Sequence, residues 1–273
     1  MRNCVRKITP NLAAICRHRA PNVRVEILEE IDSTNSFAAT IPVPAGESPR
    51  DPVAIFANRQ TAGRGRAGRK WASGGFGNIY ASFVFFPTIR AGEIANWTLW
   101  QGASICEMLN KKYGVPAKIK WPNDLFLGGK KLAGMLTDVL ADAGHVRKIV
   151  FGVGLNVFCE EENFPEEIRS VATSLAAYNN GEPFPDLDIV AVDLLECIVA
   201  AAEAFFAGKY RERLAELWAR YDLLRDKVVT AIYGNEKFSG VATGVDSGGS
   251  LKIRLRDGNI RAFSAGDATL AKE

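Results

Sequence analysis

The chain has 273 residues, enough to bury a full hydrophobic core and to form one large domain or two. Hydrophobic residues make up 47% of it and charged residues 24%, as in an ordinary globular protein. The 34 basic and 31 acidic residues leave a net charge of only +3, which argues against a general nucleic-acid binder. The five cysteines are scattered and never spaced C-x-x-C, so neither a disulfide framework nor a zinc site is indicated.

The N-terminal residues are basic but do not have the pattern of a targeting or membrane segment. The first 25 residues contain six Lys/Arg and no acid, and they lack the apolar stretch of a signal peptide. No part of the chain approaches the roughly 18 apolar residues of a membrane helix. We therefore expect a cytoplasmic protein without a membrane span, whose residues 1–24 are an extension.

The pattern of residues 25–224 predicts an α+β domain. Residues 32–35, Asp-Ser-Thr-Asn, predict a helix start because their side chains can cap the first turn. Gly114 predicts the end of a helix, and Gly128-Gly129 predicts a hairpin. The predicted strands are 23–31, 53–58, 78–86, 118–121, 125–127, 130–140 and 149–158, and the predicted helices are 11–19, 94–113, 188–207 and 211–223.

The character of the chain changes near residue 225. Residues 225–273 contain only short alternating stretches, which predict strands over 228–232, 238–242, 251–255 and 260–263. Gly248-Gly249 and Asp257-Gly258 supply hairpin turns between them. We expect a small all-β domain here, near the lower size limit for independent stability.

The strongest functional signal is a basic loop, residues 63–71, Gly-Arg-Gly-Arg-Ala-Gly-Arg-Lys-Trp. Its four cations repel one another, and its three glycines lose much backbone freedom when they are ordered. We expect it to have little order by itself and to fold around an anion such as phosphate. A solvated basic turn and an Arg/Gly segment that binds nucleic acid are the alternatives.

Two better-known phosphate loops are excluded by context. The glycines fit G-x-G-x-x-G, but residues 71–78 are too glycine-rich for the helix that a dinucleotide-binding loop needs. The acidic residue expected about 20 positions later is also missing. A Walker A loop fails because Lys-Ser/Thr does not follow the glycines.

Three further segments suggest chemistry. Residues 120–124, Lys-Trp-Pro-Asn-Asp, end a strand with a cation and a carboxylate, a pair that suits phosphate together with Mg²⁺. Residues 131–134, Lys-Leu-Ala-Gly, and 152–156, Gly-Val-Gly-Leu-Asn, place glycines in strands, where something packs against bare backbone. Taken alone, each of these segments is more often a turn, a solvated lysine or a bulge than a functional site.

Together these segments resemble the biotin protein ligases in order and spacing. The resemblance includes Ile-Asp-Ser-Thr-Asn at 31–35 and covers roughly residues 25 to 270. It implies a central mixed β-sheet flanked by helices, followed by a small SH3-like β-barrel. It also implies a reaction in two steps. Biotin and ATP first form biotinyl-5′-AMP in the presence of Mg²⁺. The biotin is then transferred to a lysine of a biotin carboxyl carrier domain, such as that of acetyl-CoA carboxylase.

The resemblance also implies roles for residues. Arg66, Lys131, Asp124 and Lys120 are the expected catalytic residues, with Asp124 orienting or deprotonating the incoming lysine. The expected biotin contacts are Ser33, Thr34, Asn35, Gln60, Gly63, Arg64, Gly65, Arg66, Lys131, Gly134, Gly152 and Gly154. The expected phosphate contacts are Arg64, Arg66, Arg69, Lys70, Trp71, Lys120, Asn123, Lys131 and Asn156, and Mg²⁺ is assigned to Asp124 and Asn156.

Two features depart from parts of that family. Members that also act as repressors carry an N-terminal DNA-binding domain, for which about 24 residues are too few, so we expect no operator binding. Ala67 stands where relatives are often basic. An exposed edge strand could pair two copies as a homodimer. The rival functions are a lipoate or octanoate ligase of the same superfamily and a non-catalytic nucleic-acid-binding module.

Overall fold

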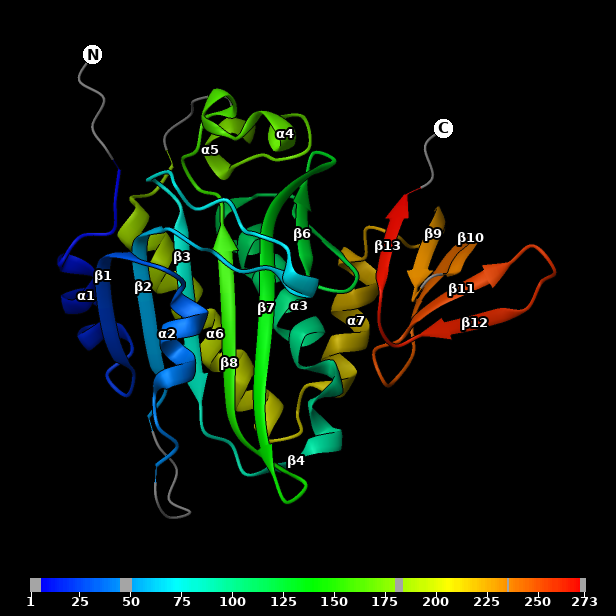
Figure 1. Ribbon diagram of the computed structural model, residues 1–273, viewed down its shortest axis with the longest axis horizontal. Helices are drawn as coiled ribbons and strands as arrows, with labels where there is room; N and C mark the ends of the chain where they lie inside the picture. Colours follow the sequence, from blue (N-terminus) through cyan, green and yellow to red (C-terminus); the bar gives the residue numbers. More distant parts are fainter. Residues whose placement is uncertain (1–5, 45–50, 180–183, 235, 271–273) are drawn as a thin grey trace. The chain divides into compact units, whose positions relative to one another are not determined.

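The computed structural model describes residues 6–44, 51–179, 184–234 and 236–270 (Figure 1). The chain divides into two compact units, each made of two chain segments. The first unit contains Met1–Ile94 and Leu127–Ala200, and the second contains Ala95–Phe126 and Ala201–Glu273.

The first unit is built on a mixed sheet, as the sequence predicts. Its strands lie in the order β1 (Arg24–Ile31), β2 (Val53–Gln60), β3 (Ile79–Phe85), β8 (His145–Leu155) and β7 (Lys130–Asp142). The first pair is parallel and the following pairs are antiparallel. A short strand, β4 (Ile89–Arg90), also pairs with β8. The two glycine-bearing strands, β7 and β8, are therefore direct neighbours.

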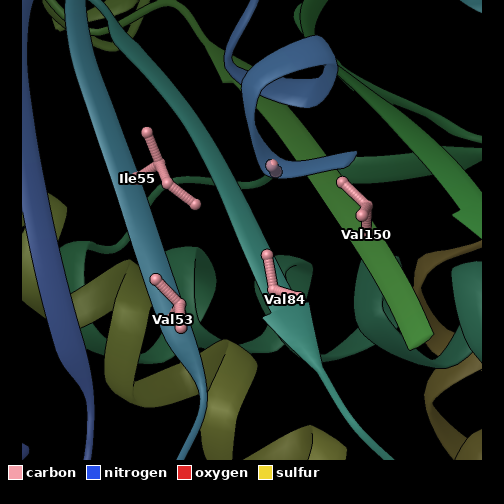
Figure 2. Close-up of a cluster of buried hydrophobic side chains, with 5 residues drawn as sticks. Val53, Ile55, Val84 and Val150 are labelled. Atoms are coloured by element: carbon pink, nitrogen blue, oxygen red, sulfur yellow. The ribbon is translucent and has the colours of Figure 1, made fainter. Parts of the chain in front are cut away.

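Helices cover this sheet on both faces. The short helix α2 (Thr34–Thr40) packs on β2, β3 and β8, while α6 (Leu187–Phe206) lies behind the sheet in Figure 1. The helix α1 (Asn11–Arg19) has the predicted bounds and contacts β1. Beneath α2, Figure 2 shows Val53, Ile55, Val84 and Val150 converging from three strands to form a buried apolar cluster with Ala38 of α2.

Several bounds in the first unit differ from the prediction. The strand β8 begins at His145 rather than at residue 149, because the turn is made by Ala143 and Gly144 with φ of 46° and 81°. The one-turn helices α4 (Glu166–Arg169) and α5 (Leu175–Tyr178) were not predicted. They are too short to show a helical period. The 3₁₀ turns are η1 (Arg66–Gly68), η2 (Ala91–Asn96) and η3 (Glu161–Asn163).

The second unit combines two helices, a strand pair and the C-terminal sheet. Helix α3 (Trp97–Tyr113) ends at Gly114, which takes the left-handed conformation with φ of 66°, as predicted. It packs on α7 (Arg211–Tyr221). The strands β5 (Lys118–Lys120) and β6 (Asp124–Leu127) form an antiparallel pair.

The C-terminal residues form a five-stranded antiparallel sheet. The strands lie in the order β12 (Ile260–Phe263), β11 (Leu251–Leu255), β10 (Glu236–Val245), β9 (Val228–Tyr233) and β13 (Asp267–Leu270). Four of them match the prediction, and β13 was not predicted. Among the described helices, none is long and apolar enough to cross a membrane. Among the described residues, Cys16, Cys106, Cys159 and Cys197 form no disulfide.

Candidate active site

The basic loop, residues 63–71, follows a path defined by its own backbone. Trp71 N donates to Gly63 O at 2.9 Å, Gly65 N donates to Arg69 O at 2.7 Å, and Arg69 N donates to Arg66 O at 3.1 Å. The loop thus closes on itself as an irregular hairpin around η1. These hydrogen bonds favour a defined path for the loop and oppose the repulsion among its cations.

Ser73 and Gln60 fix the base of this loop. Ser73 Oγ donates to Trp71 O at 2.9 Å and accepts from Gln60 Nε2 at 3.0 Å. A Cβ atom at position 63 would lie 2.3 Å from Ser73 Oγ and 2.6 Å from Trp71 O. Gly63 is therefore required for the loop to return this close to its own start.

Trp71 lies against the two neighbouring glycine strands. A Cβ atom at Gly134 of β7 would be 2.7 Å from Trp71 Cζ3, and one at Gly154 of β8 would be 2.3 Å from Cε2. The ring thus lies on bare backbone, the close approach that glycines in strands predict. Lys131 Nζ is 5.4 Å from the centroid of the same ring. Trp71 Nε1 is buried and makes no hydrogen bond with the residues that the structure describes.

A buried polar network joins the start of α2 to the sheet. Gln60 Oε1 accepts from Thr34 N at 2.8 Å and from Thr34 Oγ1 at 3.1 Å. Ser82 Oγ of β3 lies 2.8 Å from Thr34 Oγ1 and 2.6 Å from Asn35 Oδ1. A Cβ atom at Gly152 would lie 2.1 Å from Asn35 Oδ1, so this glycine makes room for the amide.

Two other side chains hold α2 in place. Ser33 is the N-cap, and its Oγ accepts from Ser36 N at 3.4 Å. At the other end, Lys148 Nζ donates to Ala39 O at 2.7 Å and to Ile41 O at 2.8 Å. Burial lowers the pKa of this ammonium group. A cation at a helix C-terminus satisfies carbonyls that have no helical partner, and it interacts favourably with the helix dipole.

Asp138 of β7 links this network to the basic loop. Its Oδ2 lies 3.1 Å from Arg64 Nη1 and accepts from Asn35 Nδ2 at 3.4 Å. Both Arg64 and Asp138 are more than a third exposed, so the ion pair contributes no more than about 1 kcal/mol. Sequence reasoning missed Asp138 and Ser82. The available signal was a lone polar residue inside an otherwise apolar strand, as Ser82 is in β3.

Lys131 and Asn156 are both anchored to the segment that precedes α5. Lys131 N donates to Val171 O at 2.7 Å, and Lys131 O accepts from Thr173 N at 2.9 Å. Asn156 Nδ2 donates to Thr173 O at 3.0 Å. These two predicted residues therefore share one support, although 25 positions separate them in the chain.

The remaining predicted residues, Lys120, Asn123 and Asp124, lie in the second unit. Lys120 and Asp124 face each other as the last pair of the β5–β6 register. Lys120 Nζ is 5.3 Å from the centroid of the Phe126 ring. Asn123, in the turn between the strands, is 7% exposed. The cation and the carboxylate of this segment are thus register partners at the strand end.

The predicted site residues of the first unit gather around β7, β8, the start of α2 and the basic loop. They are Ser33, Thr34, Asn35, Gln60, Gly63, Arg64, Gly65, Arg66, Arg69, Lys70, Trp71, Lys131, Gly134, Gly152, Gly154 and Asn156. Such an arrangement places buried polar side chains and the Trp71 ring beside a loop rich in cations. It suits a ligand with a neutral polar ring and anionic groups.

Comparison with protein families agrees with this arrangement. Residues 29–156 match the family model described as Biotin/lipoate A/B protein ligase family. Residues 226–270 match the model described as Biotin protein ligase C terminal domain. These two regions contain the basic loop, the glycine strands and all five C-terminal strands in full.

Individual relatives extend the similarity over most of the chain. The bifunctional ligase/repressor BirA of Escherichia coli is 31% identical over 246 residues, which cover 90% of this chain and 74% of the relative. The biotin–[acetyl-CoA-carboxylase] ligase of Mycobacterium tuberculosis is 30% identical, with 89% and 88% covered. The BirA of Bacillus spizizenii is 31% identical, and the chain spans only 64% of its length.

A solved structure gives the same result for the fold. The biotin protein ligase from Aquifex aeolicus in complex with biotin and ATP has a TM-score of 0.73 and 29% sequence identity. The match covers 92% of this chain and 99% of that one. On the strength of these sequence matches and of this fold, the chain belongs to the biotin protein ligases within the biotin/lipoate A/B protein ligase family.

Proposed function

We propose that this protein activates biotin with ATP to biotinyl-5′-AMP and transfers the biotin to a lysine of a biotin carboxyl carrier domain. The observation that carries the proposal is the position of Trp71. Its ring lies on Gly134 and Gly154 with a buried Nε1 that has no partner among the described residues, and Lys131 lies beside it. An apolar wall with an available donor, next to a loop with four cations, suits biotin joined to a phosphate.

The first half-reaction brings two anions together. A carboxylate oxygen of biotin attacks the α-phosphorus of ATP, the new C(O)–O–P linkage forms, and the bond to pyrophosphate breaks. Arg66 and Lys131 would neutralise the carboxylate and the α-phosphate, because fixed cations stabilise charge that accumulates in the transition state. Arg64, Arg69, Lys70 and Lys120 would serve the remaining phosphate oxygens, with Asn123 and Asn156 as polar contacts.

The neutral end of biotin requires hydrogen-bond partners rather than charges. The ureido ring carries N–H and C=O groups, which are costly to bury without partners. Ser33, Thr34 and Gln60 are all buried. Thr34 and Gln60 are hydrogen-bonded to each other, and Ser33 caps the helix α2 beside them. Asn35 and Asp138 extend this polar network toward Arg64. We assign the ureido ring to this network and the apolar part of biotin to the Trp71 side.

The second half-reaction transfers the acyl group. The amine of the carrier lysine attacks the carbonyl carbon of the mixed anhydride, a C–N bond forms, and AMP leaves with the electrons of the C–O bond. The amine must lose a proton, and Asp124 is our candidate to orient it and accept that proton. The basic loop would keep water from the adenylate during this interval.

The described residues fit Mg²⁺ only as a companion of ATP. No group of three or more His, Cys, Asp or Glu side chains among them could form a protein-built metal site. Magnesium in such enzymes is held mainly by phosphate oxygens and water, with one or two protein oxygens. Asp124 and Asn156 are the candidates for such an oxygen, and bound Mg²⁺ would offset charge on the triphosphate.

The wider setting is also a proposal. We divide the chain into an extension at 1–24, a catalytic domain at 25–224 and an SH3-like domain at 225–273, with which the match of residues 226–270 agrees. We place the reaction in the cytoplasm, where the four described cysteines would stay reduced. Strand β1 stands at one end of the sheet order, so a homodimer could form through it. Light scattering would test this, because a homodimer has twice the molecular mass of the single chain.

The deciding experiment is ATP–pyrophosphate exchange with Mg²⁺ and with biotin, octanoate or lipoate as the acid. Exchange that depends on biotin is the expected result. Exchange with octanoate or lipoate but not with biotin would move the protein to the lipoate branch of the superfamily. If folded protein exchanged with none of them, adenylation itself would be refuted, and salt-sensitive binding to nucleic acid would become the reading to test.

A further inference from the structure

Trp121 ties the Lys120–Asp124 segment to the C-terminal sheet. Its side chain is 2% exposed, and its Nε1 donates to the carbonyl oxygen of Gly249 at 3.0 Å. Both residues belong to the second compact unit. Trp121 directly follows Lys120 and precedes Asn123 and Asp124, so its position determines where those side chains are presented.

The partner of Trp121 is a rigid turn, residues 246–250, between β10 and β11. Asp246 Oδ1 accepts from Gly248 N and from Ser250 N, both at 2.9 Å. Asp246 N donates to Ser250 O at 2.9 Å and closes the turn. The turn therefore holds its shape through its own hydrogen bonds, and its carbonyl oxygen at Gly249 is a fixed acceptor.

The same turn docks on the start of α3. Asn96 Nδ2 donates to Ser247 O at 2.8 Å. Gly249 has a φ of +85°, and a Cβ atom there would lie 2.7 Å from Asn96 Oδ1 and 3.0 Å from Leu99 Cδ1. Only glycine meets both the backbone conformation and the space at this contact.

Strand β5, which leads into Trp121, is supported on a second side. Leu223 N donates to Ile119 O at 2.8 Å, and Asp222 bridges to Ile119 in parallel. On the other edge, β5 pairs with β6. The strand end has two supports from residues beyond 220: the 222–223 segment holds the backbone before Trp121, and the turn holds the indole itself.

We propose that Trp121 and Gly249 are positioning residues, and that the turn 246–250 fixes the strand end that presents Lys120 and Asp124. The inference rests on the proposed function of those two residues. It gives the C-terminal sheet a specific part in the reaction, through one hydrogen bond and one glycine contact. Neither Trp121 nor Gly249 needs to touch a substrate.

The effect expected from disturbing this contact is on rate rather than on biotin affinity. A displacement of a reacting group by about 1 Å costs on the order of a hundredfold in rate. The residues assigned to biotin's ring, Ser33, Thr34 and Gln60, lie in the first unit. Their side chains bond to one another or to Ser36, Ser73 and Ser82, which belong to the same unit. Their contribution to affinity should change by no more than about twofold.

The test compares Gly249→Ala with Gly258→Ala in the full chain. Gly258 lies in the β11–β12 turn with the same φ of +85°, but a Cβ atom there meets nothing within 4 Å. The two variants share the backbone strain and differ in the docking contact. Transfer of biotin from preformed biotinyl-5′-AMP to a carrier domain is measured beside biotin affinity by calorimetry. We expect a fall of about 10- to 100-fold in the transfer rate of Gly249→Ala, with biotin affinity kept.

Trp121→Phe is the second variant, and it decides the matter if Gly249→Ala does not fold. It removes the indole N–H, keeps an aromatic ring and adds no atoms to the contact. The proposal is overturned if either folded variant transfers biotin as fast as Gly258→Ala. It is also overturned if biotin affinity falls by the same factor as the rate, because the role would then be general stability. Absence of biotin-dependent exchange in the unmodified protein would instead refute the proposed function.

Discussion

Substitution of Gly154 by alanine tests the packing of Trp71 on the glycine strands. The added Cβ would lie 2.3 Å from Trp71 Cε2 and 2.4 Å from Nε1, far inside contact distance. Overpacking of this kind costs about 1–3 kcal/mol, since the ring or the strand must move. Alanine also recovers about 0.4–1 kcal/mol by restricting the unfolded chain. The net loss of unfolding free energy should therefore be about 1–2 kcal/mol.

The physical cause is isolated by repeating the substitution in a Trp71→Ala background. With the ring gone, Gly154→Ala should be neutral or slightly stabilising, so the coupling energy between the two positions should be about 1–3 kcal/mol. Urea unfolding of the unmodified protein, both single variants and the double variant gives this value. Gly92→Ala is the control, because a Cβ there meets nothing within 4 Å.

The outcome that would refute the packing argument is equal destabilisation by Gly154→Ala in both backgrounds. The cost would then come from something other than Trp71. A second readout links the packing to function: the single variant should also retain biotinyl-5′-AMP less well, because the loop would close less completely. If the expected coupling energy were found but the variant retained biotinyl-5′-AMP normally, the packing of Trp71 would stabilise the protein without contributing to the proposed role of the loop.

Three further predictions follow from individual contacts. Lys148→Met should lower the unfolding free energy by about 1.5–3 kcal/mol in urea, because Ala39 O and Ile41 O lose a charged donor; an unchanged midpoint would contradict this. Burial raises the pKa of Tyr80 from 10.0 to about 12. The stability that this shift contributes is present below pH 10 and is lost as the pH rises toward 12. Over that range the unfolding free energy should fall by up to about 1.4 kcal/mol per pH unit, and Tyr80→Phe should remove this dependence on pH. Lys131→Ala should reduce biotin-dependent pyrophosphate exchange by roughly a hundredfold or more, and near-normal exchange from folded protein would disprove its assigned role.

Local sequence was sufficient for features that depend on a few consecutive residues. Ser33 caps α2, Gly114 ends α3 in the left-handed conformation, and Gly128-Gly129 turns β6 into β7, all as predicted. Capping and tight turns are determined by side chains and backbone freedom within about four residues. The short helices α4 and α5 and the last strand, β13, lacked such a signal.

The sequence by itself determined the family, the mixed sheet with a β-rich C-terminus, and the set of residues that could bind an anion beside a polar ring. Only the tertiary structure decided which of them meet. It placed Trp71 on Gly134 and Gly154, joined Asp138 to Arg64, and paired Trp121 with Gly249. These contacts join positions from 63 to 128 residues apart. They depend on strand order and on close approach of backbone to side chain, which a linear pattern of residue types does not record.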